Sequence, residues 1–194
     1  MIDQLYQYFN RYVPLSHQEV EAFCHYLEQK TYSRKAYLLE EGETCHHNFF
    51  ITKGLVRTFH LDNKGNEHIV LFGIENWWVT NIESFVRANP SKLNIQALEE
   101  TTVLALSKNN LEKLYKQIPQ LERAFRMMTE NMLIAVLRHN ELSREMNNEE
   151  MYENIVSELP GFVQRIPQYM LASYLGMSPE HLSALRKTMS KKIK

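Results

Sequence analysis

The sequence is short of several features that would place it in a special class of protein. Its 194 residues include two cysteines, Cys24 and Cys45, which allow at most one disulfide and exclude a disulfide-stapled scaffold. It has no uncharged apolar run of about eighteen residues or more, the length of a membrane span. Its first twenty residues lack the basic start and apolar middle of a secretory signal. We therefore expect a reduced, cytoplasmic protein without a membrane partner.

A strong charge of one sign is also absent, but the net charge of -1 hides an uneven distribution. Residues 160–194 carry six Lys or Arg against one acidic residue, a net charge of +5. The preceding 159 residues carry 16 basic and 22 acidic side chains, a net charge of -6. Such asymmetry indicates a nucleic-acid partner for the basic end, although a solvated basic tail has the same composition.

What is present is the composition of an ordinary folded protein, with 44% hydrophobic and 23% charged residues. The first thirty residues read as helix, and residues 15–30 open with Ser16 as a cap and Glu19 three residues later. From Arg34 to Ser107, short β-branched and aromatic runs alternate with turns, among them the glycine turn at residues 63–66. This region predicts an antiparallel β-sandwich or barrel.

A long segment without glycine or proline follows Pro119. In residues 120–146, apolar side chains alternate at spacings of four and three, the pattern of a coiled-coil seam, which predicts a dimerisation helix. The predicted seam residues are Leu121, Phe125, Met128, Met132, Ala135, His139 and Leu142. A helix buried in its own domain has the same pattern. We favour the dimer because Leu133, Val136 and Leu137 leave a second apolar face to pack on the sheet domain.

Residues 171–187 hold two short helical patterns joined by a glycine. Gly176 stands where a chain leaves a helix through a left-handed conformation, and Ala172 is small enough for a close helix crossing. Ser178 is a strong N-cap, and Pro179 fits the first helical position. Two helices joined in this way form a helix-turn-helix, whose second helix lies in the major groove of DNA. A plain helical hairpin shares much of this pattern.

The second of these helices has two faces. Leu182 and Leu185 give it one buried stripe, and the opposite face is left outward. The predicted DNA-binding residues are Ser178, Pro179, Glu180, His181, Ser183, Arg186 and Lys187. Glu180 is an acceptor for a cytosine amino group, whereas Arg186 and Lys187 are interpreted as phosphate contacts.

The order of these elements resembles that of the Crp/Fnr superfamily of bacterial transcription regulators. The resemblance rests on the layout and on the stretches "ENWW", "ESF", "NIQALEETTVLALS" and "LPGFVQRIPQYMLASYLGMSPEHLSALRK". Only seven residues follow Lys187, so the chain looks like a short branch without the usual β-hairpin wing. The resemblance implies an α+β protein with a cyclic-nucleotide-binding-type β-roll, a double-stranded β-helix, in residues 1–118. A long dimerisation helix would follow in residues 119–146, and an all-α helix-turn-helix domain in residues 147–194.

The same resemblance implies the partners. These are a second copy of the chain, a pseudo-palindromic double-stranded DNA site and RNA polymerase, with an unknown small-molecule effector if one exists.

Nucleotide-binding members of the family hold the cyclic phosphate with a Gly-Glu pair and an Arg-Ser or Arg-Thr pair. The matching positions here are Thr80 and Asn81, then Ser91 and Lys92, so all four differ. Lys92 offers a point charge but not the planar fork of arginine. We therefore predict a degenerate effector pocket that binds no cyclic AMP or cyclic GMP and is filled by its own side chains, including the two adjacent tryptophans.

Other chemistries find little support in the sequence. Two cysteines cannot supply the four ligands of the iron–sulfur members of the family. Adjacent side chains of the run "CHH" at 45–47 point to opposite faces of a strand, and no spaced second pair of the zinc type is present. Nothing indicates a haem on His60, His68 or His139. Without a nucleophile–base pair or phosphate loop, we predict no metal, no cofactor and no enzyme.

The leading hypothesis is therefore a dimeric DNA-binding transcription regulator of the Crp/Fnr type whose effector is not a cyclic nucleotide. The alternative is an effector-sensing or protein-interaction module that has lost sequence-specific DNA binding. It is motivated by Pro179 and Ala184, which stand where family members commonly place arginine.

Overall fold

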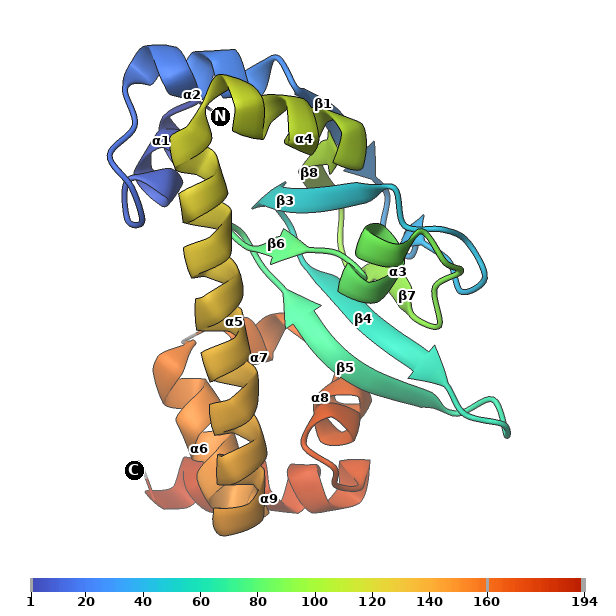
Figure 1. The fold of residues 1–194 in the computed structure, drawn as a ribbon. Coiled ribbons are helices and arrows are strands. Elements are labelled where there is room, and N and C mark those ends of the chain that lie inside the picture. Colours follow the sequence, from blue (N-terminus) through green and yellow to red (C-terminus); the bar gives the residue numbers. More distant parts are fainter. Residues whose placement is uncertain (1, 160, 193–194) are drawn as a thin grey trace.

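The computed structural model describes residues 2–159 and 161–192. The helices of this part of the chain are α1 (Ile2–Phe9), α2 (His17–Cys24), α3 (Ile82–Arg87), α4 (Lys108–Gln117), α5 (Pro119–Glu145), α6 (Asn148–Glu158), α7 (Phe162–Arg165), α8 (Gln168–Tyr174) and α9 (Pro179–Lys192). The strands are β1 (Leu27–Tyr32), β2 (Tyr37–Leu39), β3 (His47–Lys53), β4 (Val56–Leu61), β5 (Glu67–Gly73), β6 (Trp78–Val79), β7 (Asn94–Ala97) and β8 (Thr101–Ser107). Figure 1 shows their arrangement. Among the helices described, none has both the length and the apolarity needed to cross a bilayer.

The strands form two four-stranded antiparallel sheets, which together make a β-roll. One sheet has the order β1-β8-β3-β6 and the other the order β2-β7-β4-β5. The predicted glycine turn joins β4 to β5: Gly65 takes φ +81°, and Asp62 Oδ1 accepts hydrogen bonds from the amides of Lys64 and Asn66 at 2.8 and 2.9 Å. Glycine supplies the left-handed conformation that this hairpin needs. Strand β5 lies at the edge of its sheet.

The N-terminal helical region ends earlier than the sequence pattern predicts. Ser16 does cap α2 in the expected capping box, because its Oγ accepts from Glu19 N at 3.2 Å and Glu19 Oε2 accepts from Ser16 N at 2.8 Å. The helix stops at Cys24, however, and residues 27–32 form β1 instead of continuing as helix. Each residue of β1 pairs with a residue of β8, far away in the sequence. This tertiary pairing overrides the local helical pattern.

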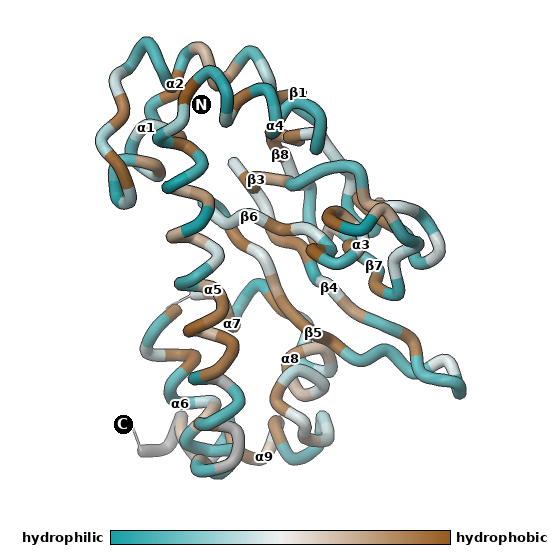
Figure 2. Tube along the Cα trace, in the orientation of Figure 1, coloured by the Kyte–Doolittle hydropathy of each residue, from teal (hydrophilic) through white to brown (hydrophobic). Residues whose placement is uncertain are grey.

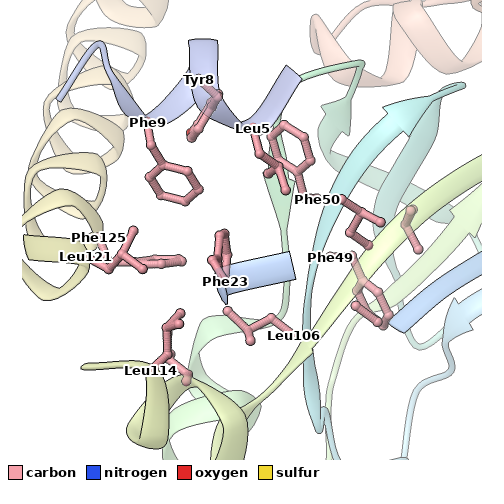
Figure 3. Packing of buried hydrophobic residues seen from close by; sticks show 14 of the residues in the cluster. Leu5, Tyr8, Phe9, Phe23, Phe49, Phe50, Leu106, Leu114, Leu121 and Phe125 are labelled. Atoms are coloured by element: carbon pink, nitrogen blue, oxygen red, sulfur yellow. The ribbon is translucent and has the colours of Figure 1, made fainter. Parts of the chain in front are cut away.

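The main core lies between the first sheet and helices α1, α2, α4 and α5 (Figure 3). Phe9, Phe23 and Phe50 are among its largest fully buried side chains. The ring of Phe9 lies 5.2 Å from Phe23 and 5.7 Å from Phe125, in edge-to-face and tilted contacts. Burying one such side chain contributes roughly 1.5–3 kcal/mol. The core therefore fixes the first turns of α5 against the β-roll.

Helix α5 leaves this core along its length, which is about 40 Å at 1.5 Å per residue. Leu121 is fully buried and Phe125 nearly so, but the C-terminal half of the helix stands clear of the β-roll. Figure 2 shows that this half includes a hydrophobic stretch. Its exposed large apolar residues are Met132, Leu133, Ile134, Val136, Leu137 and Leu142.

The C-terminal helices share their core with the second sheet. Buried residues of α6 to α9 form one hydrophobic cluster with Leu55, Phe59, Ile69 and Phe72, which come from β4, β5 and the turn before β4. Figure 1 shows α8 beside β5, at the end of the molecule away from α1 and α2. The predicted units at residues 1–118 and 147–194 are therefore packed directly on one another.

Candidate functional site

Helices α8 and α9 meet at the predicted glycine turn. Gly176 takes φ +66°, and Met177 N donates a hydrogen bond back into α8 at 2.9 Å, which closes the end of that helix. Helix α9 begins at Pro179, and Ser178 caps it, because Ser178 Oγ accepts a hydrogen bond from His181 N at 3.2 Å. All of these features are local, so the turn forms where the sequence predicts it.

Helix α9 has a buried face and an outward face. Leu182 is fully buried and Leu185 nearly so, and both belong to the same cluster as Ala172 of α8. The outward residues, which we call the reading face, are Ser178, Pro179, Glu180 and His181, all exposed, and the half-buried Ser183. Further along the helix, Arg186 is half-buried and Lys187 is exposed.

The reading face combines several groups that complement a duplex. The first amides of α9 lack partners within the helix, and the helix dipole places partial positive charge at this end. Within the reading face, Glu180 and His181 supply an acceptor and an imidazole, and beyond it Arg186 and Lys187 add full positive charge. Such a surface can attract phosphates and can also form hydrogen bonds with base edges.

Three of the four predicted effector-pocket residues form hydrogen bonds within the protein itself. Asn81 Nδ2 donates to Ser91 Oγ at 2.7 Å, and Ser91 Oγ donates to Leu93 O at 2.7 Å. Thr80 Oγ1 donates to His47 O at 3.0 Å. Asn81 and Ser91 are both buried. The polar groups of Thr80, Asn81 and Ser91 are therefore already paired within the protein.

The neighbouring helix α3 tightens the same network. Asn81 Oδ1 caps the helix by accepting from Ser84 N at 3.3 Å. Ser84 Oγ donates to Asn89 O and accepts from Cys45 N at 2.8 Å. Lys92, the fourth predicted position, is exposed. It lies outside this buried network, which thus carries no side-chain cation at these positions.

The tryptophans do not fill this pocket, contrary to the prediction from the sequence. Trp78 pairs with Phe50 in the ladder between β6 and β3, and its ring lies 5.2 Å from Phe50 and 5.4 Å from Phe125. It therefore belongs to the main core. Trp77 is 38% exposed. Trp77 lies just before β6, whereas Trp78 is its first residue, and the two rings have different surroundings.

Two open hollows lie near His47 instead. They have volumes of about 290 and 250 Å³ and are lined by residues of the β2–β3 loop, β1 and the start of α4. Burial holds the pKa of His47 below its ordinary value, so its imidazole is neutral near pH 7. None of the four predicted effector-pocket residues lines either hollow.

Metal-ligating side chains are scattered. In the described part of the chain, no three His, Cys, Asp or Glu side chains are grouped to hold a metal ion. Cys24 and Cys45 are free thiols. His60 and His68 stack on the β4–β5 hairpin with ring centroids 5.1 Å apart, and His68 Nε2 lies 3.2 Å from Asp62 Oδ2.

The predicted seam divides between two environments. Leu121 and Phe125 are buried in the core of their own chain, so they are not available to a second chain, whereas Met128 is only partly buried against the same core. Met132, Ala135 and Leu142 are exposed. The side chain of His139 lies outside what the structure describes.

The second apolar face is also placed differently from the prediction. Leu133, Val136 and Leu137 are exposed instead of packing on the sheets, because α5 has by then left the β-roll. At 100° per residue, these three residues and Met132 occupy an arc of about 140° around the helix axis. We call Met132, Leu133, Val136 and Leu137 the apolar face of α5.

A group of contacts that the sequence did not predict joins the C-terminal helices to the β-roll. Arg165 of α7 donates to both carboxylate oxygens of Glu75 at 2.8 and 2.9 Å and to Glu99 at 2.6 Å. Ser173 of α8 bonds to the backbone of β5. Arg165 is separated from its partners by 90 and 66 residues, and no local pattern signals such pairs.

Comparisons with known proteins agree with this architecture. Residues 29–118 match the family model of the cyclic nucleotide-binding domain. A search of curated proteins finds no match. Among solved structures, the c-di-GMP responsive global regulator CLP of Xanthomonas campestris is 12% identical, with a TM-score of 0.72 over 91% of this chain and 93% of that one.

Two further solved structures are similar to this chain over most of their length. FixK2 from Bradyrhizobium japonicum is 18% identical, with a TM-score of 0.72 over 86% of this chain and 85% of its own. The catabolite activator protein of Thermus thermophilus is also 18% identical, with a TM-score of 0.57 over 93% and 86%. The chain therefore shares their fold, a β-roll followed by a long helix and further helices.

Proposed function

We propose that the chain is a DNA-binding transcription regulator of the Crp/Fnr type, dimeric and reading a pseudo-palindromic operator. The observation that carries this proposal is the exposed reading face at the capped start of α9, held outward by the packing of α8. The two helices act as a helix-turn-helix. The solved relatives are named as a global regulator and as an activator, which is consistent with this role.

Helix α9 enters the major groove with its N-terminal end toward the bases. The groove is about 12 Å wide and admits one helix. Glu180 accepts a hydrogen bond from a cytosine amino group, and Arg186 and Lys187 neutralise phosphates beside the groove. Bound DNA then places the protein where it contacts RNA polymerase.

The second copy of the chain covers the apolar face of α5. Each of these four side chains is about half exposed, so burying what remains of its surface stabilises a dimer by roughly 1 kcal/mol each. Monomeric proteins rarely expose so continuous an apolar surface. Two copies of α5 packed side by side give the two-fold axis that a pseudo-palindromic operator requires.

The effector, if one exists, is not a cyclic nucleotide. Asn81 and Ser91 bond to each other and to the backbone, so a cyclic phosphate would have to break buried hydrogen bonds and would meet no arginine fork. Calorimetry with cyclic AMP and cyclic GMP is expected to give no binding in the micromolar range. Cyclic di-GMP belongs in the same series, because the Xanthomonas protein is described as responsive to it. One-site micromolar binding of any of the three would contradict this part of the proposal.

Selection from a library of random duplexes tests the DNA-binding role. The purified protein, with no nucleotide added, is expected to enrich two inverted half-sites whose centres are about 10–11 base pairs apart, or a multiple of that distance. Enrichment of no common sequence would favour the alternative role of a module that no longer reads DNA.

A further inference from the structure

Helix α8 packs against β5 and bonds to its free edge. Ile69 N of this edge strand donates to Ser173 Oγ at 3.4 Å, and Ser173 Oγ donates to Glu67 O at 3.3 Å. The hydroxyl thus bridges two backbone groups that an edge strand would otherwise leave to water. Ser173, in the first helix of the proposed helix-turn-helix, therefore fixes the position of α8 along β5.

Arg165 makes a second, charged attachment one turn before α8. Its guanidinium lies between Glu75, in the β5–β6 loop, and Glu99, in the β7–β8 turn. Glu75 Oε1 also accepts from Gly54 N, in the β3–β4 turn, at 2.8 Å. The planar guanidinium bonds to both oxygens of Glu75, a geometry that fixes direction as well as distance. Two connections of the β-roll therefore contact Arg165 directly, and a third is joined to it through Glu75.

A third attachment is aromatic. Phe72 of β5 lies between Phe162 of α7 and Tyr174 of α8, with ring centroids 5.6 and 5.4 Å away and interplanar angles of 78° and 68°. Both contacts are edge-to-face, the preferred arrangement for aromatic pairs. Helices α7 and α8 are thus held at three points: the edge of β5, the charged cluster around Arg165 and the aromatic contacts of Phe72.

These attachments define the position of the reading face relative to α5. Helix α9 is fixed to α8 by the Gly176 turn and by the fully buried Ala172 and Leu182. The β-roll is fixed to the first turns of α5 by Leu121 and Phe125. A continuous packed path therefore runs from α5 through the β-roll and α8 to α9.

We propose that Arg165, Glu75, Glu99 and Ser173 are positioning residues that set the distance and angle between the two reading faces of the dimer. This inference rests on the proposed function, because it concerns how a dimer measures its operator. Each base pair inserted between half-sites moves them about 3.4 Å apart and turns one relative to the other. A rigid attachment makes the protein sensitive to that change, whereas a loosened attachment lets α9 follow the displaced half-site.

The test compares operators that differ only in spacer length. The variant is Glu75→Gln with Glu99→Gln, which keeps the shape of both side chains and removes the charges that face Arg165. The matched control is Glu100→Gln, in the same turn as Glu99, because Glu100 pairs with Lys53 at the surface and not with Arg165. Hydrogen exchange of the free proteins reports on docking: the β5 and α8 amides are expected to exchange faster in the double variant than in the wild type or the control.

The expected binding result is a loss of spacing selectivity. Wild type and control should bind the operator with the best spacer at least about tenfold more tightly than one whose spacer is two base pairs longer. A tenfold loss of affinity is the size expected when one base contact is lost. The double variant should bind both within about threefold of each other. Arg165→Lys, which keeps the charge but not the paired hydrogen bonds, should fall between them.

Two failures can be told apart. If the wild type binds no duplex specifically, the proposed function fails, whatever the exchange rates show. If the wild type binds specifically and the double variant keeps the full spacing preference, the positioning role of this cluster is wrong.

Discussion

Gly54 illustrates how a single residue constrains this molecule. It lies in the β3–β4 turn at φ +111°, a conformation that other residues rarely adopt. A Cβ at this position would lie 2.5 Å from Thr101 Oγ1 and 2.7 Å from Thr101 Cα. Its amide also donates to Glu75, which binds Arg165. One glycine therefore serves both the packing of the β-roll and the docking of the C-terminal helices.

Replacing this glycine should be costly. Gly54→Ala adds backbone strain and a clash with Thr101, and we expect the free energy of unfolding to fall by about 2–4 kcal/mol. Gly65→Ala is the matched control, because Gly65 also has positive φ but has no atom within 4 Å of a Cβ. Strain alone should then cost about 1 kcal/mol. Urea denaturation measures both values, and equal losses would show that the contact with Thr101 is not responsible.

Glu180 is the residue on the reading face whose role is most specific. Glu180→Ala should relax the preference at one base pair in each half-site, a discrimination of roughly 1–3 kcal/mol, because an acceptor for cytosine is lost. Glu153→Ala removes another exposed carboxylate, from α6, and serves as the control. Binding to a set of half-site variants measures the effect. An unchanged ranking of sites in the Glu180 variant would show that this residue does not read a base.

Lys187 should behave differently from Glu180. As a phosphate contact it adds affinity for every sequence alike, so Lys187→Ala should weaken binding uniformly and reduce the salt slope by about 1. Titrations at two or more salt concentrations on a preferred and a random duplex measure both quantities. A loss confined to the preferred duplex would mean that Lys187 reads the sequence.

Among the elements, α5 shows what periodicity can and cannot predict. The spacing of four and three correctly indicates a helix with one apolar side, since those residues lie on one face whatever covers it. The spacing does not show whether that apolar side packs against the same chain or against a second chain. Leu121 and Phe125 lie in the aromatic core of their own chain, whereas Met132, Leu133, Val136 and Leu137 are exposed. That division depends on where the helix leaves the β-roll, which is a property of the whole fold.

The apolar face of α5 leads to a prediction about assembly. Leu133→Glu with Leu137→Glu places like charges on both sides of the proposed dimer contact and should give a monomer at concentrations where the wild type is dimeric. Val86→Glu is the control, because Val86 of α3 is 55% exposed, close to Leu133 at 56%. Light scattering at micromolar concentration measures the mass. A monomeric wild type would contradict the proposed dimer.

Local signals in the sequence predicted other elements well. The Ser16 and Ser178 caps, the Gly176 turn and the β4–β5 hairpin each depend on a few adjacent residues, and all four form as predicted. The predictions that failed depend on distant partners. Residues 27–32 pair with β8, and Trp78 turns toward Phe125. The contacts of Arg165 also depend on distant residues. Its partners lie 90 and 66 positions away, so no short stretch of the sequence contains both residues of either pair.

For the molecule as a whole, the docking of the C-terminal helices should depend on pH. Burial alone would raise the pKa of Glu75, but hydrogen bonds from Arg165 and Gly54 N outweigh it and hold the pKa below the ordinary value of 4.5. A carboxyl group with a lowered pKa in the folded state stabilises that state above its ordinary pKa. The contribution is lost as the pH falls through the lowered pKa.

The comparison of wild type with Glu75→Gln measures this contribution. The free energy of unfolding should be about 1 kcal/mol higher for the wild type at neutral pH, the size expected for a partly exposed ion pair. The difference should stay constant down to about pH 4.5 and shrink below it as Glu75 takes up a proton. A difference that does not change with pH would mean that the charge of Glu75 is not what holds Arg165.

The most direct test of the proposed function is the ratio of two dissociation constants. Fluorescence anisotropy gives the affinity of the full chain, without added effector, for the selected duplex and for a shuffled duplex of the same length and composition, at one physiological salt concentration. A sequence-reading dimer should bind the selected duplex at least about a thousandfold more tightly. A ratio near one would contradict the central claim that α9 reads DNA sequence.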